Sequence, residues 1–135
     1  MDAPHTNVNN TNIGYHIPTG TIKFDRTAFD TGKKMNITSG IYSAPKDGLY
    51  LFGVDGHKCS GNALAEVRVY HNKVLVKSVS HSDATPQSTQ LTSFWTLEMK
   101  TGDQVYLVNN QATSLYTLGN NPATYQFAFV GFYLA

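Results

Sequence analysis

Hydrophobic and polar side chains alternate along two stretches of the chain. Over residues 65–69, the small and apolar side chains fall on one face and the charged ones on the other. Residues 91–99 repeat this pattern, and one face is formed by Leu91, Trp95, Leu97 and Met99. Successive side chains of a strand point to opposite sides, so both stretches are predicted to be strands with one buried and one wetter face.

Two other stretches are apolar at nearly every position. Residues 49–54 read Leu-Tyr-Leu-Phe-Gly-Val, and residues 127–134 read Phe-Ala-Phe-Val-Gly-Phe-Tyr-Leu. A strand that is apolar on both faces has to be covered on both faces. In a two-layer sandwich the second sheet covers only the inner face. We therefore expect a partner subunit to cover the outer one.

Turn-forming residues separate the apolar stretches at short intervals, for example Asp-Thr-Gly at 30–32 and Thr-Gly-Asp at 101–103. This spacing is typical of a β-sandwich or barrel. No long amphipathic helix, internal repeat or Gly-X-Y tract is apparent. We expect one all-β domain over residues 21–135, preceded by a loose leader rich in Asn and Thr over residues 1–20.

Charge and composition narrow the classes of partner. Charged residues make up 14% of the 135 residues, and the net charge is +1. A nucleic-acid-binding protein normally carries a basic cluster, so no nucleic-acid partner is expected. The longest apolar run is far shorter than the roughly 20 residues of a membrane span, so no membrane insertion is expected. The first residues lack the apolar core of a signal peptide, which leaves both a cytosolic protein and a mature secreted form open.

Cys59 is the only cysteine, so an internal disulfide is excluded. Two interpretations stay open for it. It is either a partly buried free thiol or one half of a disulfide to another chain, and the second requires an oxidising compartment.

Three blocks of residues, in order, resemble the globular head of the C1q family. Residues 36–52 contain Gly-x-Tyr, a proline and Gly-x-Tyr-x-Phe, residues 97–107 contain Leu-x-x-x-x-Gly-Asp-x-Val, and residues 127–134 end on Phe-x-Gly-x-x-Leu. The positions that carry the resemblance are Gly40, Tyr42, Pro45, Gly48, Tyr50, Phe52, Gly102, Asp103, Val105, Phe129, Gly131 and Leu134. Tyr42 stands where the family commonly has Phe. We interpret these residues as builders of the fold, with turns at the glycines and local hydrogen bonds at Asp103.

The resemblance implies a ten-strand jelly-roll β-sandwich of the C1q and tumour necrosis factor group, assembled as a homotrimer. It also implies a secreted, extracellular protein. Head-only members of invertebrate type that lack a collagen stalk often act as lectins in innate immunity, where they recognise carbohydrate patterns on microbes or host cells. A second implied role is that of a cytokine-like or adhesive ligand, which binds a receptor protein through the flank of the trimer.

Motifs of catalysis are missing from the sequence, so no enzymatic activity and no obligatory cofactor are expected. Some C1q-like heads bind calcium, and Asp55, Asp83 and Asp103 are the candidate oxygen donors. Sugar recognition needs polar groups beside an aromatic face. The loop residues that combine these are His57, Lys58, His81, Asp83, Tyr116, Asn120 and Asn121. An anionic sugar would favour Lys58, Arg68 or Lys77.

Overall fold

The computed structural model describes residues 4–10, 17–58, 65–81, 89–110 and 127–135. Within these residues the chain forms eleven β-strands and no helix. The strands are β1 (His5–Asn10), β2 (Gly20–Thr21), β3 (Arg26–Asp30), β4 (Met35–Asn36), β5 (Ile41–Ser43), β6 (Gly48–Lys58), β7 (Ala65–His71), β8 (Val74–His81), β9 (Thr89–Met99), β10 (Gln104–Asn109) and β11 (Phe127–Tyr133).

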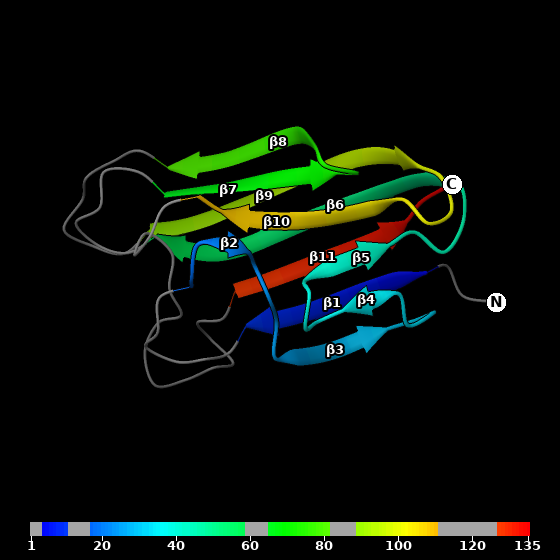
Figure 1. Cartoon of the computed structure of the whole chain (residues 1–135), viewed down its shortest axis with the longest axis horizontal. Helices are drawn as coiled ribbons and strands as arrows, with labels where there is room; N and C mark the ends of the chain where they lie inside the picture. Colours follow the sequence, from blue (N-terminus) through cyan, green and yellow to red (C-terminus); the bar gives the residue numbers. More distant parts are fainter. Residues whose placement is uncertain (1–3, 11–16, 59–64, 82–88, 111–126) are drawn as a thin grey trace.

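The strands form two antiparallel sheets that face each other (Figure 1). The five-stranded sheet has the order β3-β1-β11-β6-β9. The six-stranded sheet has the order β4-β5-β10-β7-β8, and the two-residue strand β2 pairs with β10 beside this path. Ten strands thus follow two five-strand paths, and the predicted ten-strand jelly-roll sandwich is confirmed.

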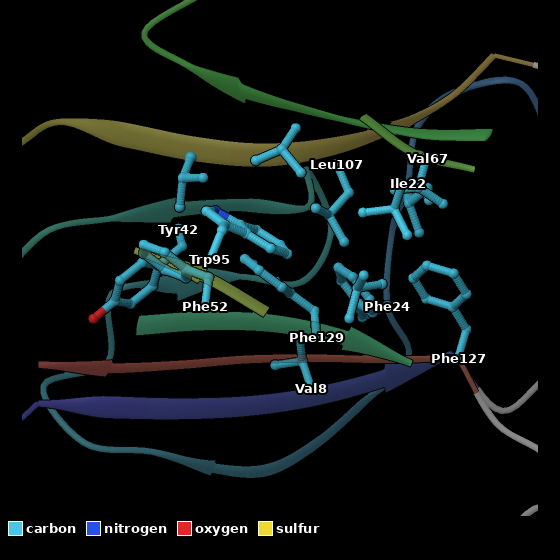
Figure 2. Packing of buried hydrophobic residues seen from close by; sticks show 14 of the residues in the cluster. Val8, Ile22, Phe24, Tyr42, Phe52, Val67, Trp95, Leu107, Phe127 and Phe129 are labelled. Carbon is cyan, nitrogen blue, oxygen red and sulfur yellow. The ribbon is translucent and has the colours of Figure 1, made fainter. Parts of the chain in front are cut away.

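Aromatic side chains fill the space between the two sheets (Figure 2). The Phe52 ring from β6 is stacked 6.0 Å from that of Trp95 and 5.8 Å from that of Phe129. The six-stranded sheet faces them with buried Val67 and Leu107. The alternation in the sequence accounts for this arrangement, because every second residue of a strand points into the same layer.

Strand β9 shows the alternation over residues 91–99. Its inward residues include Leu91, Trp95 and Met99, which are buried. Its outward residues are Thr92, Phe94, Thr96 and Glu98, which are exposed. The sequence pattern of residues 91–99 therefore predicted both faces. The exception is Phe94, a large apolar side chain on the outer face that the alternation does not account for.

Strand β1 lies within residues 1–20, where the sequence predicted a loose leader. It pairs with β11 on one side and with β3 on the other, so it is an interior strand of the five-stranded sheet. Thr6 and Val8 point into the core and are fully buried. The sheet thus includes residues before the predicted domain boundary at residue 21. Backbone pairing with β11 therefore orders a segment that contains only one apolar residue, Val8.

Backbone conformations of positive φ close two of the turns. Gly40 has φ of +80°, and a Cβ atom there would overlap the carbonyl oxygen of Ile22, so the position requires glycine. Asn72 and Lys73 both have positive φ between the paired residues His71 and Val74. Two consecutive residues of positive φ are typical of the tight hairpin turn that matches the twist of its strands.

Candidate functional site

Three of the seven predicted ligand residues lie where strands end, at one end of the sandwich. His57 and Lys58 are the last residues of β6, and Lys58 pairs with Thr89 at the start of β9. His81 is the last residue of β8 and pairs with Ala65 at the start of β7. Strand β6 belongs to the five-stranded sheet and β8 to the six-stranded one, so both sheets bring predicted residues to this end, which we call the loop end (Figure 1).

The other four predicted ligand residues, Asp83, Tyr116, Asn120 and Asn121, lie outside the described residues, as does Cys59. The strands that precede them are nevertheless in place. Strand β8 delivers the chain to the loop end at His81, and β10 delivers it there at Asn109. The buried Asn109 side chain donates a hydrogen bond of 2.7 Å to the carbonyl oxygen of Ile17, which fixes the end of β10.

The opposite end of the sandwich, the turn end, contains a hollow of about 440 Å³. Its lining includes His71, Asp47 and Asp103. Asp103 Oδ2 lies 2.9 Å from His71 Nε2 and accepts a 3.0 Å hydrogen bond from the Lys100 backbone N–H. Asp103 Oδ1 accepts a 3.0 Å hydrogen bond from the Asn72 side chain. One carboxylate thus ties the β7–β8 turn to the β9–β10 turn.

These hydrogen bonds stabilise the charged form of Asp103. The Lys100 backbone N–H contributes most, followed by the side chains of Asn72 and His71, and together they lower the pKa of Asp103 to about 2. Asp47 has a similar role in the turn between β5 and β6. It accepts hydrogen bonds from the backbone N–H and the hydroxyl of Thr101, at 2.7 and 2.9 Å, and these lower its pKa. The two aspartates of the hollow therefore hold turns together.

The candidate calcium donors do not converge in the described part of the chain. Asp103 lies at the turn end, whereas Asp55 lies far along β6 and accepts a 2.9 Å hydrogen bond from Thr92. Asp83 is outside the described residues. Among the described residues, no group of three or more His, Cys, Asp or Glu side chains is placed to hold a metal ion. Calcium stays the alternative to the expected absence of a cofactor that the sequence left open.

The outer face of the five-stranded sheet carries an apolar patch over three adjacent strands, β11, β6 and the edge strand β9. Phe94 of β9 is 61% exposed and Phe132 of β11 is 39% exposed. Between them, Val130 pairs with Gly53, which pairs with Phe94. The Phe94 ring lies over Gly53, because a Cβ atom at Gly53 would come within 2.6 Å of two ring carbons of Phe94. This apolar face is where the sequence predicted that one sandwich could not cover its own strands.

The outer face of the six-stranded sheet carries Arg68, which the sequence predicted for an anionic sugar, and two tyrosines that are not among the seven predicted loop residues. Tyr70 and Tyr106 stack on it beside a network of polar side chains. The two tyrosines are cross-strand partners of β7 and β10. The sequence contains one signal for this surface, an outward tyrosine in each of two alternating strands. Only the register between those strands shows that the two tyrosines are neighbours.

The described fold defines a protein of the jelly-roll sandwich class. The profile of the C1q domain matches residues 7–134, and the chain therefore belongs to the C1q domain family. A search of curated proteins finds no match. Within the described residues, no helix has the length and apolar character needed to cross a membrane.

Solved structures with a similar fold include a complement protein and a murine protein. The globular domain of zebrafish complement 1qA protein matches with a TM-score of 0.78 and 16% sequence identity, over 98% of each chain. The crystal structure of murine APRIL at pH 5.0 matches with a TM-score of 0.70 and 12% identity, over 96% of this chain and 98% of that one. At these identities the likeness establishes the fold.

Proposed function

We propose that the protein is a secreted, homotrimeric recognition protein of innate immunity, which binds carbohydrates on microbes or host cells through the loops at the loop end. Binding, with no catalysis, is the activity. The observation that supports this proposal most is the arrangement of the strands. Both sheets bring the chain to one end, at Lys58, His81 and Asn109, and the segments that follow contain the polar and aromatic residues predicted to contact ligand.

The apolar outer face of the five-stranded sheet supports the trimer. Phe94 and Phe132 expose large aromatic side chains on it, with Leu51 and Val130 between them. Monomeric proteins seldom expose a contiguous apolar patch that spans several strands. A second copy of the chain is the occupant we propose, because the C1q family supplies the precedent of a trimer and the face is continuous over β9, β6 and β11.

The composition of the loop-end segments supports a carbohydrate ligand. Aromatic rings cover the C–H faces of sugars, and side-chain amides, carboxylates and imidazoles bind the hydroxyl groups. Tyr116 supplies an aromatic ring, and Asn120 and Asn121 supply side-chain amides. Asp83 supplies a carboxylate and His81 an imidazole. Loops carried on a rigid sheet are a common place for binding residues, because they vary without disturbing the fold.

Two measurements on the full chain test the proposal. Light scattering at dilute concentration should give a mass of three times the 14.8 kDa chain. A glycan array should give a reproducible set of hits that free sugar competes away. A mass equal to one folded chain refutes the trimer, and an array without reproducible hits refutes the carbohydrate ligand. Running the array with and without EDTA tests calcium, since a calcium-dependent site loses its hits in EDTA.

A second candidate function is that of a cytokine-like or adhesive ligand for a receptor protein. Strand β8 is the edge of the six-stranded sheet, and three consecutive aliphatic side chains on it, Val74, Leu75 and Val76, are exposed. An apolar stretch on an edge strand favours contact with another protein. Capture of the chain by cell-surface protein that survives complete deglycosylation would favour this role over sugar binding.

A further inference from the structure

A stacked pair of tyrosines lies on the outer face of the six-stranded sheet. Tyr70 of β7 and Tyr106 of β10 are directly opposite each other across the antiparallel ladder. Their ring centroids are 5.6 Å apart and their planes differ by 10°. Their sequence neighbours Val69, Val105 and Leu107 are buried in the core, so the two tyrosines point outward. Both are only partly buried, which leaves ring surface open to solvent.

A network of polar side chains lies next to this pair on the same face. Glu66 Oε1 accepts hydrogen bonds from Arg68 Nε at 2.8 Å and from Asn110 Nδ2 at 3.3 Å. Glu66 Oε2 accepts a hydrogen bond from the Ser78 hydroxyl at 2.9 Å. The network therefore joins three adjacent strand regions, β8, β7 and the end of β10.

The network is electrostatically connected to the tyrosines. Hydrogen bonds to Glu66 and then to Tyr70 raise the pKa of Arg68. Desolvation acts to raise the pKa of Glu66, but hydrogen bonds from Ser78 and Arg68 outweigh it and lower that pKa. The carboxylate and the guanidinium are both charged, and each orients the other. Side chains already held in one geometry lose little entropy when a ligand binds.

We propose that this face, defined by Tyr70 and Tyr106 with Glu66 and Arg68, binds an uncharged sugar built of flat pyranose rings. The tyrosine pair offers aromatic surface to the C–H face of the ring. The polar network offers both donors and acceptors, as the hydroxyl groups of a sugar require. The charges of Glu66 and Arg68 cancel, so the face complements a neutral ligand better than a sialic acid or a nucleic acid.

The inference rests on the proposed carbohydrate-binding function for the class of ligand, but it assigns a different surface. Of the predicted ligand residues, the described ones His57, Lys58 and His81 lie at the loop end. Tyr70 and Tyr106 lie near the turn end of β7 and β10. Asn110 follows the end of β10, so the network extends from the tyrosine pair towards the loops. A sugar chain bound on this face would run along the flank of the sandwich.

Cellotetraose is a suitable probe, because its β-linked glucose rings are neutral and have flat C–H faces. Titrated into the full-length protein, it should shift the backbone amide NMR signals of Tyr70, Arg68 and Tyr106. Tyr106→Leu should weaken binding about five- to tenfold, since it removes the ring and keeps an apolar side chain. Tyr106→Phe is the matched control, and it should bind within about twofold of wild type because the ring remains.

A second variant covers the case in which Tyr106→Leu fails to fold. Arg68→Gln leaves both rings in place and breaks the ion pair with Glu66, which lies at the surface. It should weaken cellotetraose binding at least threefold and leave the melting temperature nearly unchanged, because a surface ion pair contributes only about 0–1 kcal/mol.

The possible outcomes separate this inference from the proposed function. If the glycan array gives hits but cellotetraose causes no shifts at Tyr70, Arg68 and Tyr106, the inference is wrong and the loop site stands. If sialyllactose, and not cellotetraose, shifts these signals, the neutral class of ligand is wrong. If Tyr106→Leu folds and binds cellotetraose as tightly as Tyr106→Phe does, the tyrosine pair is not the site. If no sugar binds at all, both the inference and the lectin function fail.

Discussion

The two outer faces of the sandwich carry different side chains, although the strands of both sheets turn every second side chain into the core. On the five-stranded sheet the outward residues include Phe94, Val130 and Phe132, which form an apolar face. On the six-stranded sheet the outward residues include Glu66 and Arg68, which are hydrogen-bonded to each other beside a tyrosine pair. The inner faces are alike, since both are apolar and buried.

This difference indicates what each outer face contacts. An apolar face that a single sandwich leaves open is suited to another protein surface, because covering it removes apolar area from water. A face of paired charges and hydroxyl-bearing side chains is already satisfied in water, and it gains from a ligand that offers hydrogen bonds in return. The contrast supports the proposal that the chain assembles through the five-stranded sheet and contacts ligand through the six-stranded sheet and the loop end.

The largest expected effect on stability comes from a substitution in the core, between the two outer faces. Gly131 points into the core, and a Cβ atom there would lie 2.9 Å from Cε1 of Phe52. Gly131→Val should destabilise the fold by about 1–3 kcal/mol through overpacking, which lowers the stability of both faces together. Chemical denaturation monitored by Trp95 fluorescence measures this. Val130→Thr, on the outward side of the same strand, is the control. A Gly131→Val variant with unchanged melting and unchanged mass would show that β11 is placed wrongly.

The second prediction separates the two faces. Phe94→Glu places a charge on the apolar face of the five-stranded sheet, and it should reduce the mass in light scattering from three chains to one while the domain stays folded. The side chain is 61% exposed in the single chain, so its loss opens no large cavity in the core. Gln104→Glu adds the same charge on the six-stranded sheet and should leave the mass at three chains. Equal masses for both variants would contradict the assignment of assembly to one face.

The third prediction concerns the turns that align β7 with β10, the strands of the tyrosine pair. The folded state lowers the pKa of Asp103 from 3.8 to about 2, so the charged carboxylate stabilises the fold above pH 4. That stabilisation is lost as the pH falls from about 4 to about 2. The melting temperature of wild type should therefore fall more steeply in this window than that of Asp103→Asn, which cannot titrate. Parallel curves would mean that the Asp103 hydrogen bonds contribute nothing to stability.

Much of the fold could be predicted from local pattern, and one strand could not. Residues 91–99 alternate so regularly that both faces of β9 follow from the sequence. Strand β1 has the sequence His-Thr-Asn-Val-Asn-Asn, which contains a single apolar residue and many turn formers. Its register with β11, His5 opposite Phe132, depends on residues at the far end of the chain. A local pattern does not contain such long-range pairing.

The candidate sites follow the same division. The positions of His57, Lys58 and His81 near strand ends could be predicted, because turn signals mark where strands stop. The Tyr70–Tyr106 pair could not, since it exists only once the register of β7 and β10 is known. Tyr42 is a smaller case. The sequence interpreted it as a builder of the fold. The structure buries its hydroxyl without a hydrogen-bond partner among the described residues, and burial raises its pKa. Whether a buried tyrosine hydroxyl finds a hydrogen-bond partner depends on three-dimensional packing, which a local sequence pattern does not contain.

The smallest expected effect on stability is at the loop end, and it sharpens the distinction between the loops and the six-stranded face. Asp83→Ala and Tyr116→Ala should each change the free energy of unfolding by less than about 0.5 kcal/mol, as substitutions outside a core usually do. If the loops hold the sugar, both variants lose glycan-array hits while cellotetraose still shifts the Tyr106 signal. If either variant unfolds the domain, that residue has a structural role and is no longer a candidate for ligand contact at the loop end. Hits that persist in both loop variants and vanish in Tyr106→Leu would move carbohydrate recognition from the loops to the sheet.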